Sequence, residues 1–322
     1  MSSNASLLTR ARRLKSLIVR PFLGVYHLEG EFQDQPLSMV VAGDSTTLGY
    51  IRGLAFPKGC GVSRKGVVSQ FKAPGLARAE ADVVVIGASR LLAPKYREMG
   101  FSLAPRSVRL SLAVYDNPDS MVDNLPGSAR EDLRRNIRRM KQNNYQCEIT
   151  NDDDWFDLFY HRMYKPYAEN KYGELTHLCG YRRLRYDFRR GMGISVRRDG
   201  SHVAGAVSYF NGSVMINHWK GILDGDQAVA RDGASLALYY YRIQLAFERG
   251  YKTADFGYSA PFVTDGALNY KLKWGMEVVN RDNSRVVYAI AAPGRTEQAV
   301  RFLRANRFYC LNGKGLELCD DF

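Results

Sequence analysis

Several features that would assign this protein to a narrow class are missing from its sequence. Its five cysteines are scattered and form no C-x-x-C pair, which argues against a disulfide framework or a zinc ribbon and favours reduced thiols. No run of about 18 apolar residues occurs, so no membrane-spanning helix is predicted. Residues 1–15 lack the apolar core and cleavage site of a secretory signal. We therefore expect a cytoplasmic, metal-free protein.

Two common nucleotide-binding signatures are also missing. The chain has no G-x-G-x-x-G motif after a first strand and no Walker loop. Dinucleotide-binding and P-loop functions are therefore not predicted.

The composition is that of a folded protein with an excess of positive charge. The chain has 322 residues, of which 45% are hydrophobic and 25% charged, with a net charge of +13. This length favours two domains. The positive charge favours anionic partners, such as coenzyme A (CoA) phosphates, nucleotide-linked substrates, RNA or an acidic membrane surface.

The N-terminal part is rich in predicted strands. Residues 6–20 predict a basic amphipathic helix, which either contacts the inner face of a membrane or packs on the protein through its apolar stripe. Strands are predicted at 25–32, 37–43, 49–56, 81–87 and 108–115, with a short helix at 94–99. Turn signals at 117–127 indicate a boundary. The predicted divisions are an N-terminal helix (1–21), an N-terminal domain (22–126) and a C-terminal domain (127–322).

The C-terminal part predicts helices and antiparallel strands. Ser128 and Glu131 form a capping-box pattern before a helix at 128–143, whose basic face is either solvated or binds phosphate. Further helices are predicted at 152–166, 181–190, 234–249, 267–274 and 297–306. Strands are predicted at 193–200, 202–212, 213–223, 253–259 and 285–291. This order predicts an α+β protein.

A short sequence pattern is repeated in the two parts. Residues 85–89 (VIGAS) and 255–259 (DFGYS) each end a predicted strand and precede a helix that ends in a bulky residue and Gly. The order strand, G-x-S, helix and strand suggests a duplicated fold. Val85 occupies the place of Asp255, so we expect the chemistry in the second copy.

The C-terminal residues 128–292 also contain a series of motifs in a fixed order. They are R-x-x-I-R-R (134–139), Tyr164-Lys165-Pro166-Tyr167, Gly173, Gly233-Ala234-Ser235, Asp255-Phe256-Gly257 and Tyr270-Lys271-Leu272-Lys273-Trp274-Gly275. In this order they resemble the GNAT-like acyltransferase domain of the Fem-type family. That family builds peptidoglycan cross-bridges from aminoacyl-tRNA, and related domains occur in bacterial acetyltransferases linked to envelope or polysaccharide synthesis.

The resemblance implies a duplicated GNAT-like fold, with two mixed, mostly antiparallel sheets flanked by helices. It implies that a loop before the central helix binds the pyrophosphate of acyl-CoA, here through Arg231, Gly233, Ala234 and Ser235. A helix N-terminus suits such an anion. The usual R/Q-x-x-G-x-G/A signature is reduced here to one Gly and Ala234.

Three residues are the catalytic candidates. Asp255 would orient an amine, or act as a base if burial raised its pKa. By the resemblance, Tyr258 would protonate a thiolate leaving group, and Lys271 would neutralise a phosphate or a developing oxyanion. The remaining alternatives are structural roles for each.

Five residues are the candidates for substrate binding. By the resemblance, an aromatic and basic segment would contact the acceptor, and His218 lies on the strand before the cofactor loop. The five are Tyr164, Lys165, Tyr167, Tyr172 and His218.

The predicted activity is transfer of an acyl group from acyl-CoA to an amine of an envelope-related, polysaccharide-related or other small substrate, without a covalent enzyme intermediate. One alternative is an aminoacyl-tRNA-dependent transferase, with tRNA as the partner. Another is a non-catalytic GNAT-like module that binds anions.

Overall fold

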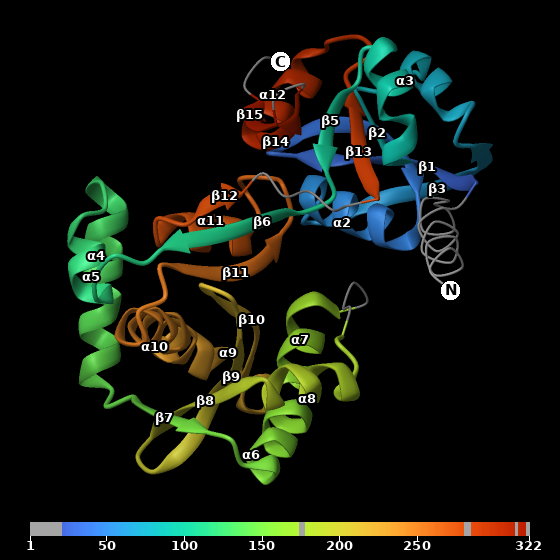
Figure 1. Ribbon diagram of the computed structural model, residues 1–322. Helices are drawn as coiled ribbons and strands as arrows, with labels where there is room; N and C mark the ends of the chain where they lie inside the picture. The colour runs from blue at the N-terminus through green and yellow to red at the C-terminus, as the bar shows by residue number, and fades with distance from the viewer. Residues whose placement is uncertain (1–20, 174–177, 280–284, 313–314, 320–322) are drawn as a thin grey trace, which may run out of the picture. The chain divides into compact units, whose positions relative to one another are not determined.

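The computed structural model describes residues 21–173, 178–279, 285–312 and 315–319. Contacts divide them into two compact units (Figure 1). Unit 1 takes residues 21–108 and 259–268 and all described residues from 285 onward, and unit 2 takes 109–258 and 269–279. The boundaries expected after residues 21 and 126 remain a prediction, and the helix expected at 6–20 lies outside the described residues.

Unit 1 is built on a six-stranded mixed sheet in the order β3-β1-β2-β4-β13-β5. β1 and β2 form an antiparallel hairpin, and β4 runs parallel to β2. β13 is antiparallel to both its neighbours, β4 and β5. The strands are β1 (Phe22–Phe32), β2 (Gln35–Gly43), β3 (Cys60–Ser69), β4 (Val83–Ser89), β5 (Ser102–Pro105) and β13 (Val286–Ala291), with a separate hairpin of β14 (Phe308–Leu311) and β15 (Leu316–Cys319). The helices are α2 (Ser45–Ala55), α3 (Ala93–Glu98) and α12 (Glu297–Ala305).

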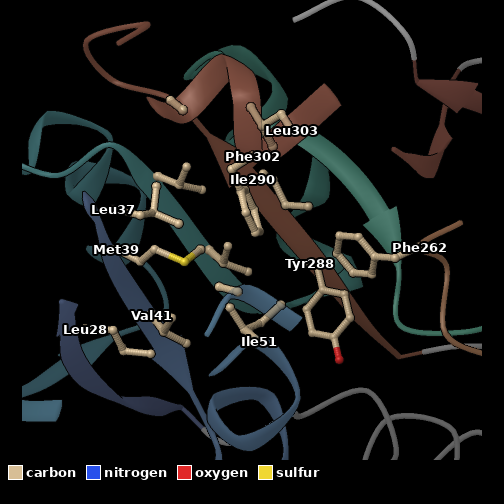
Figure 2. Close-up of a cluster of buried hydrophobic side chains, with 14 of the residues drawn as sticks. Leu28, Leu37, Met39, Val41, Ile51, Phe262, Tyr288, Ile290, Phe302 and Leu303 are labelled. Carbon is tan, nitrogen blue, oxygen red and sulfur yellow. The ribbon is translucent and has the colours of Figure 1, made fainter. Parts of the chain in front are cut away.

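The core of unit 1 explains why its copy of the repeated pattern, residues 85–89, is apolar. All seven residues of β4 are buried, as expected for a central strand covered on both faces. Val85, the counterpart of Asp255, is 1% exposed and belongs to the cluster that includes Met39, Ile51 and Phe302 (Figure 2). A carboxylate at this position would be desolvated among apolar side chains.

Unit 2 is built on a seven-stranded mixed sheet in the order β12-β6-β11-β10-β9-β8-β7. β7 to β10 are antiparallel to one another, and β11 runs parallel to β10. The strands are β6 (Val108–Ala113), β7 (Gln146–Thr150), β8 (Gly191–Arg198), β9 (Ser201–Asn211), β10 (Val214–Ile222), β11 (Thr253–Ser259) and β12 (Glu277–Val279). The helices are α4 (Pro118–Asp123), α5 (Gly127–Gln142), α6 (Asp153–Leu158), α7 (Lys165–Tyr172), α8 (Tyr181–Arg189), α9 (Gln227–Val229), α10 (Ser235–Glu248) and α11 (Gly266–Lys273).

Helices cover both faces of the central strands of unit 2. α10 packs on β8, β9, β10 and α5, while α8 packs on β8 and β9. Figure 1 shows α7 and α8 on the other side of these strands from α5 and α10. The α8 side is packed by aromatic rings, with Trp155 stacked on Phe159 at 5.4 Å between centroids. A Cβ atom on Gly193 would lie only 2.2 Å from the Trp155 ring, so this strand position requires glycine.

The two units repeat one local topology. An antiparallel hairpin, a helix and a strand parallel to the second hairpin strand occur in the same order as β1-β2-α2-β4, with β3 inserted before β4, and as β9-β10-α10-β11. The α+β class and the duplicated fold are therefore confirmed. β6, from the N-terminal half of the sequence, pairs in the sheet of unit 2, and β13, from the C-terminal half, pairs in that of unit 1.

Two local predictions were wrong. Residues 49–56 lie largely in helix α2, not in a strand, because the Asp44 side chain accepts the Thr47 N–H at 2.8 Å and the buried residues Thr47, Ile51 and Ala55 have helical spacing. Helix α5 begins at Gly127, so Ser128 lies inside it and makes no cap. Strands β3, β5, β7, β12, β14 and β15 were not predicted. Within the described residues, no helix is long and apolar enough to cross a bilayer.

Candidate functional site

The strands β10 and β11 part next to Asp255. Their parallel pairing is limited to three residue pairs, Val214–Thr253, Met215–Ala254 and Ile216–Asp255. Beyond Ile216 the register between β10 and β9 is also interrupted, up to Trp219. The interruption is a β-bulge, which redirects side chains and ends regular pairing.

At this bulge, three consecutive side chains of β10 contact three different elements. Nε2 of His218 lies 3.4 Å from Oδ1 of Asp255. Nε1 of Trp219 donates to Asp187 of α8 at 3.2 Å. Lys220 instead donates to Oγ of Ser235 in α10 at 3.0 Å. The bulge therefore places His218 against β11 and Lys220 against the start of α10.

Asp255 is the centre of the group beside β11. Its side chain is 3% exposed, and its Oδ2 accepts from both Nε and a terminal nitrogen of Arg109 on β6. Its Oδ1 accepts the Gly257 N–H at 2.7 Å and faces His218. Nε2 of His218 is buried and forms no hydrogen bond within the described residues. Arg109, Asp255 and His218 thus come together from three neighbouring strands.

The charge of Asp255 differs from one sequence expectation. Burial alone would raise its pKa, but His218, the Arg109 guanidinium and the Gly257 N–H together lower the pKa to about 2. The condition set for Asp255 as a base, a raised pKa, is therefore not met. A permanently ionised Asp255 is suited to orient a neighbouring group.

Tyr258, near the end of β11, is contacted by Lys271 of α11. Tyr258 is 47% exposed, and its ring lies 6.4 Å from that of His218, centroid to centroid. Lys271 is 5% exposed and donates from Nζ to the Tyr258 carbonyl oxygen at 3.0 Å. The three catalytic candidates are thus close neighbours in space.

A cationic group lies around the start of α10. Nζ of Lys220 lies 4.8 Å from the Tyr239 ring centroid and 5.6 Å from that of Tyr167. Burial lowers the pKa of Lys220 well below its ordinary value, and nearby cations lower it further; they are Lys171, Arg242 and Lys271. Arg242 is 1% exposed, and burial lowers its pKa to about 10. Positive charge in so dry a place favours an anion.

The predicted cofactor loop is held in place by charge pairs. Asp232 is paired with Arg139 of α5 at 2.9 Å and with Arg198 of β8 at 2.6 Å. Gly233 has a φ of 122°, which a side chain rarely adopts. Arg231 is exposed and Ala234 is buried. The backbone is kinked at Gly233, where it leaves helical geometry, and α10 follows from Ser235.

The predicted acceptor segment is only partly brought to the site. Tyr167 lies beside Lys220, as described above. Tyr164 is buried in the aromatic packing, with its hydroxyl accepting the Cys179 N–H at 2.9 Å and its ring 5.9 Å from that of Trp219. Lys165 is exposed and lies 3.9 Å from Glu169. The side chain of Tyr172 lies outside what the structure describes.

The basic face of α5 is largely paired with acids. Four of its cations contact carboxylates of unit 2. The pairs are Arg134–Asp123, Arg135–Asp132, Arg139–Asp232 and Lys141–Asp119. Surface pairs of this kind contribute little stability, but they reduce the charge available to a phosphate.

Sequence reasoning missed Arg109 and Lys220. Arg109 lies in a strand with alternating apolar residues, assigned to the N-terminal domain, and is 146 residues from Asp255. Only strand pairing brings it to the site, and no motif signals that pairing. Lys220 lies near the end of β10. The bulge that directs it toward α10 has no signature in the residues themselves.

A comparison with protein families identifies a domain in part of the chain. Residues 127–272 match the family model described as acetyltransferase (GNAT) domain. No curated protein sequence matches the chain. Similar solved structures include FemX, with 14% identity over 83% of this chain and 84% of that chain and a TM-score of 0.44.

Two further similar structures concern lysylphosphatidylglycerol synthetases. One is the C-terminal domain of a putative enzyme from Agrobacterium fabrum (11% identity, 87% of this chain and 84% of that chain, TM-score 0.39). The other is L-PGS from Bacillus licheniformis (12% identity, 87% of this chain and 84% of that chain, TM-score 0.39). These identities and TM-scores are too low to carry a function to this chain. The family-model match covers residues 127–272, less than half of the chain, and identifies this part as similar to GNAT acetyltransferase domains.

Proposed function

We propose that the protein is an N-acyltransferase that moves an acyl group from acyl-CoA to the amine of a small or envelope-related substrate. The observation that supports this most strongly is the parting of β10 and β11 after only three residue pairs, beside Asp255. Parted strands expose backbone N–H and C=O groups that an extended, amide-containing donor arm can pair with.

The cationic group around Lys220 fits the phosphates of such a donor. Lys220 reaches Ser235 at the start of α10, and Lys171, Arg242 and Lys271 act on it electrostatically. A donor phosphate would contact Lys220 and the turn at Arg231, Gly233, Ala234 and Ser235. The charge of the phosphate would offset the cost of burying these cations.

The chemistry needs mainly placement of the two reactants. Holding an amine against an activated carbonyl supplies a large part of the acceleration in such reactions. Lys271 would stabilise the negative charge that develops on the carbonyl oxygen, and Tyr258 would give a proton to the leaving thiolate. Asp255, ionised at neutral pH, would orient the polar groups beside it. Of the predicted acceptor residues, Tyr167 beside Lys220 and His218 beside Asp255 would contact the acceptor. Contacts from Tyr164, Lys165 and Tyr172 stay predictions.

An aminoacyl-tRNA donor is the second candidate. It is favoured by the reduced loop signature, in which a single glycine, Gly233, precedes α10. A non-catalytic anion-binding module is the third candidate.

Binding titrations separate the donors. Wild-type protein and Lys220→Met are titrated calorimetrically with acetyl-CoA and, separately, with aminoacylated tRNA at physiological salt. We expect saturable binding of acetyl-CoA that weakens in Lys220→Met. Retention of tRNA without binding of acetyl-CoA would overturn the acyl-CoA proposal in favour of the second candidate. Acetyl-CoA binding without acyl transfer to any amine would support the third.

A further inference from the structure

We propose that His218 removes the proton from the acceptor amine, and that Arg109 is a positioning residue that holds Asp255 against His218. This inference rests on the proposed acyl transfer. It assigns a direct chemical role to a histidine expected only to contact substrate, and a role to an arginine from another part of the sequence.

The two carboxylate oxygens of Asp255 contact different groups. Oδ2 is occupied by two nitrogens of Arg109. Oδ1 accepts the Gly257 N–H and lies 3.4 Å from Nε2 of His218. This distance is long for a hydrogen bond, but catalytic hydrogen bonds commonly tighten when substrate binds. The carboxylate therefore cannot rotate without breaking contacts on both sides.

The orientation of His218 leaves one ring nitrogen for a substrate. With Nε2 turned to Asp255, the neutral ring carries its proton on Nε2, and Nδ1 is free to act as an acceptor. The carboxylate then stabilises the imidazolium that forms when Nδ1 takes a proton, as in other His–carboxylate pairs. Asp255 itself stays ionised, because its pKa is about 2.

The ring of His218 is fixed by its neighbours. Tyr209 of β9 and Trp219 of β10 lie edge-on, at 6.3 Å and 6.0 Å between centroids, and Tyr258 of β11 lies at 6.4 Å. A Cβ atom on Gly257 would approach Cδ2 of His218 to 3.1 Å. The titratable and charged groups around the ring are therefore Asp255 and Tyr258 on β11, Tyr209 on β9 and Arg109 on β6, the last acting through Asp255.

Arg109 adjusts how strongly Asp255 acts on the histidine. Its guanidinium balances the carboxylate charge and holds the carboxylate in place beside the histidine. Removing Arg109 would free Asp255 to rotate and would leave its full charge to favour imidazolium.

The proposed step balances as an aminolysis. The amine nitrogen attacks the thioester carbonyl carbon, forming a C–N bond, while Nδ1 of His218 takes one proton from that nitrogen. The C–S bond breaks, and the sulfur leaves with its electron pair and receives a proton from Tyr258. The net result is one amide and one thiol. His218 then releases the proton that it took and Tyr258 regains the proton that it lost, both by exchange with solvent, which Tyr258 reaches because it is 47% exposed.

Kinetics of matched variants test the proposal. Steady-state turnover is measured across pH for wild type, His218→Gln, Arg109→Gln and Arg109→Lys. His202→Gln and Arg162→Gln are the controls, because His202 pairs with Ser195 and Arg162 makes a comparable two-nitrogen contact with Asp224 on the surface. Thermal unfolding confirms that each variant is folded.

We expect His218→Gln to lower kcat about 100-fold or more, the usual scale for a lost general base, with KM for the donor nearly unchanged. Arg109→Gln should lower kcat about tenfold, as removal of an orienting partner does, and move the acid limb of the kcat/KM profile to higher pH. Arg109→Lys should restore part of both. Turnover of His218→Gln within about threefold of wild type, or an unchanged pH profile in Arg109→Gln, would overturn the proposal.

A chemical probe tests the same linkage without turnover. Diethyl pyrocarbonate modifies neutral imidazole, and modification of His218 is followed peptide by peptide across pH in wild type and Arg109→Gln. The midpoint for His218 should move to higher pH in the variant, whereas that for His202 should stay. Equal midpoints at His218 would contradict the Arg109 linkage. Absent acyl transfer in wild type, with the shift observed, would instead count against the proposed function alone.

Discussion

Arg109 and Asp255 lie 146 residues apart in sequence and form an ion pair between adjacent strands, β6 and β11. The pair joins the N-terminal half of the sequence to the strand that carries the catalytic candidates. Asp255 is almost fully buried, while the Arg109 side chain is 21% exposed. Removing either partner leaves the other with an uncompensated charge in a poorly solvated place.

Asp255→Asn should change the pH dependence of stability. The pKa of Asp255 is lowered from 3.8 to about 2 in the folded protein, so its ionised form stabilises the fold above pH 3.8 and this contribution disappears as pH falls through 2. The shift corresponds to about 2 kcal/mol. The difference in unfolding free energy between wild type and variant should narrow by about that amount from pH 5 to pH 2.

Denaturant unfolding at several pH values measures this difference. Asp224→Asn is the control, because Asp224 makes a similar contact with Arg162 at an exposed position. We expect little change for Asp224→Asn, since exposed pairs contribute little. A difference for Asp255→Asn that stays constant with pH would show that its carboxyl group is not selectively charged in the folded state.

Lys220→Met should stabilise the protein and weaken donor binding. Burial and neighbouring cations lower the pKa of Lys220 in the folded state. The unfolded chain therefore takes up a proton more readily below pH 10.5, which lowers wild-type stability there. The advantage of the variant should be present at pH 7 and shrink as pH rises toward 10.5.

The same variant should bind acetyl-CoA about 10-fold or more weakly, the scale of one lost charge-assisted hydrogen bond. Thermal shifts and calorimetric titration at pH 7 report both effects. Stabilisation with unchanged donor affinity would make the lysine a purely structural feature and remove it from the donor site.

Gly257→Ala should lower both stability and turnover. Gly257 has a φ of 72°, and a Cβ atom there would lie 3.1 Å from His218. Gly250→Ala is a matched control, because Gly250 has a φ of 73° but open space around its Cα. Both variants should lose about 1–2 kcal/mol through backbone strain, and only Gly257→Ala should lower kcat. Equal kcat values in the two variants would exclude a role for the packing between Gly257 and His218.

Thr296→Ala should destabilise unit 1, whereas Ser128→Ala should have little effect. Thr296 caps α12 by accepting the Ala299 N–H at 3.1 Å, and it donates to Asp82 at 2.6 Å. Loss of such a cap costs about 1 kcal/mol. Ser128 makes no cap, since α5 begins one residue earlier. Thermal unfolding of the two variants compares them directly, and a larger loss for Ser128→Ala would contradict this assignment.

Local patterns predicted the elements of unit 2 well, for a physical reason. The strands β8, β9 and β10 are separated by the turn signals Asp199-Gly200 and Asn211-Gly212. The buried stripe of α5 at Leu133, Ile137 and Met140 follows helical spacing. In unit 1, Asp44 and the helical spacing of Thr47, Ile51 and Ala55 were available in the sequence. They were outweighed by the apolar run 49–56, because short runs of this kind fit both a strand and a helix.

The site itself was only partly predictable. Asp255, Tyr258 and Lys271 lie close together in sequence, so their proximity in the fold follows from one strand and the helix after it. Arg109 depends on a strand from the other half of the chain that pairs beside β11. The sequence left open whether Asp255 orients an amine or acts as a base with a raised pKa. The groups that lower its pKa, namely His218, Arg109 and the Gly257 N–H, are brought to it by the fold.

The central claim is transfer of an acyl group to an amine, and product formation measures it most directly. Wild-type protein and His218→Gln are incubated with acetyl-CoA and a panel of amines, and N-acylated products and free CoA thiol are quantified by mass spectrometry. We predict equal amounts of amide and thiol from at least one amine with wild type, and about 100-fold less with His218→Gln. Absence of an amide product from wild type, with acetyl-CoA and with aminoacyl-tRNA alike, would contradict the account.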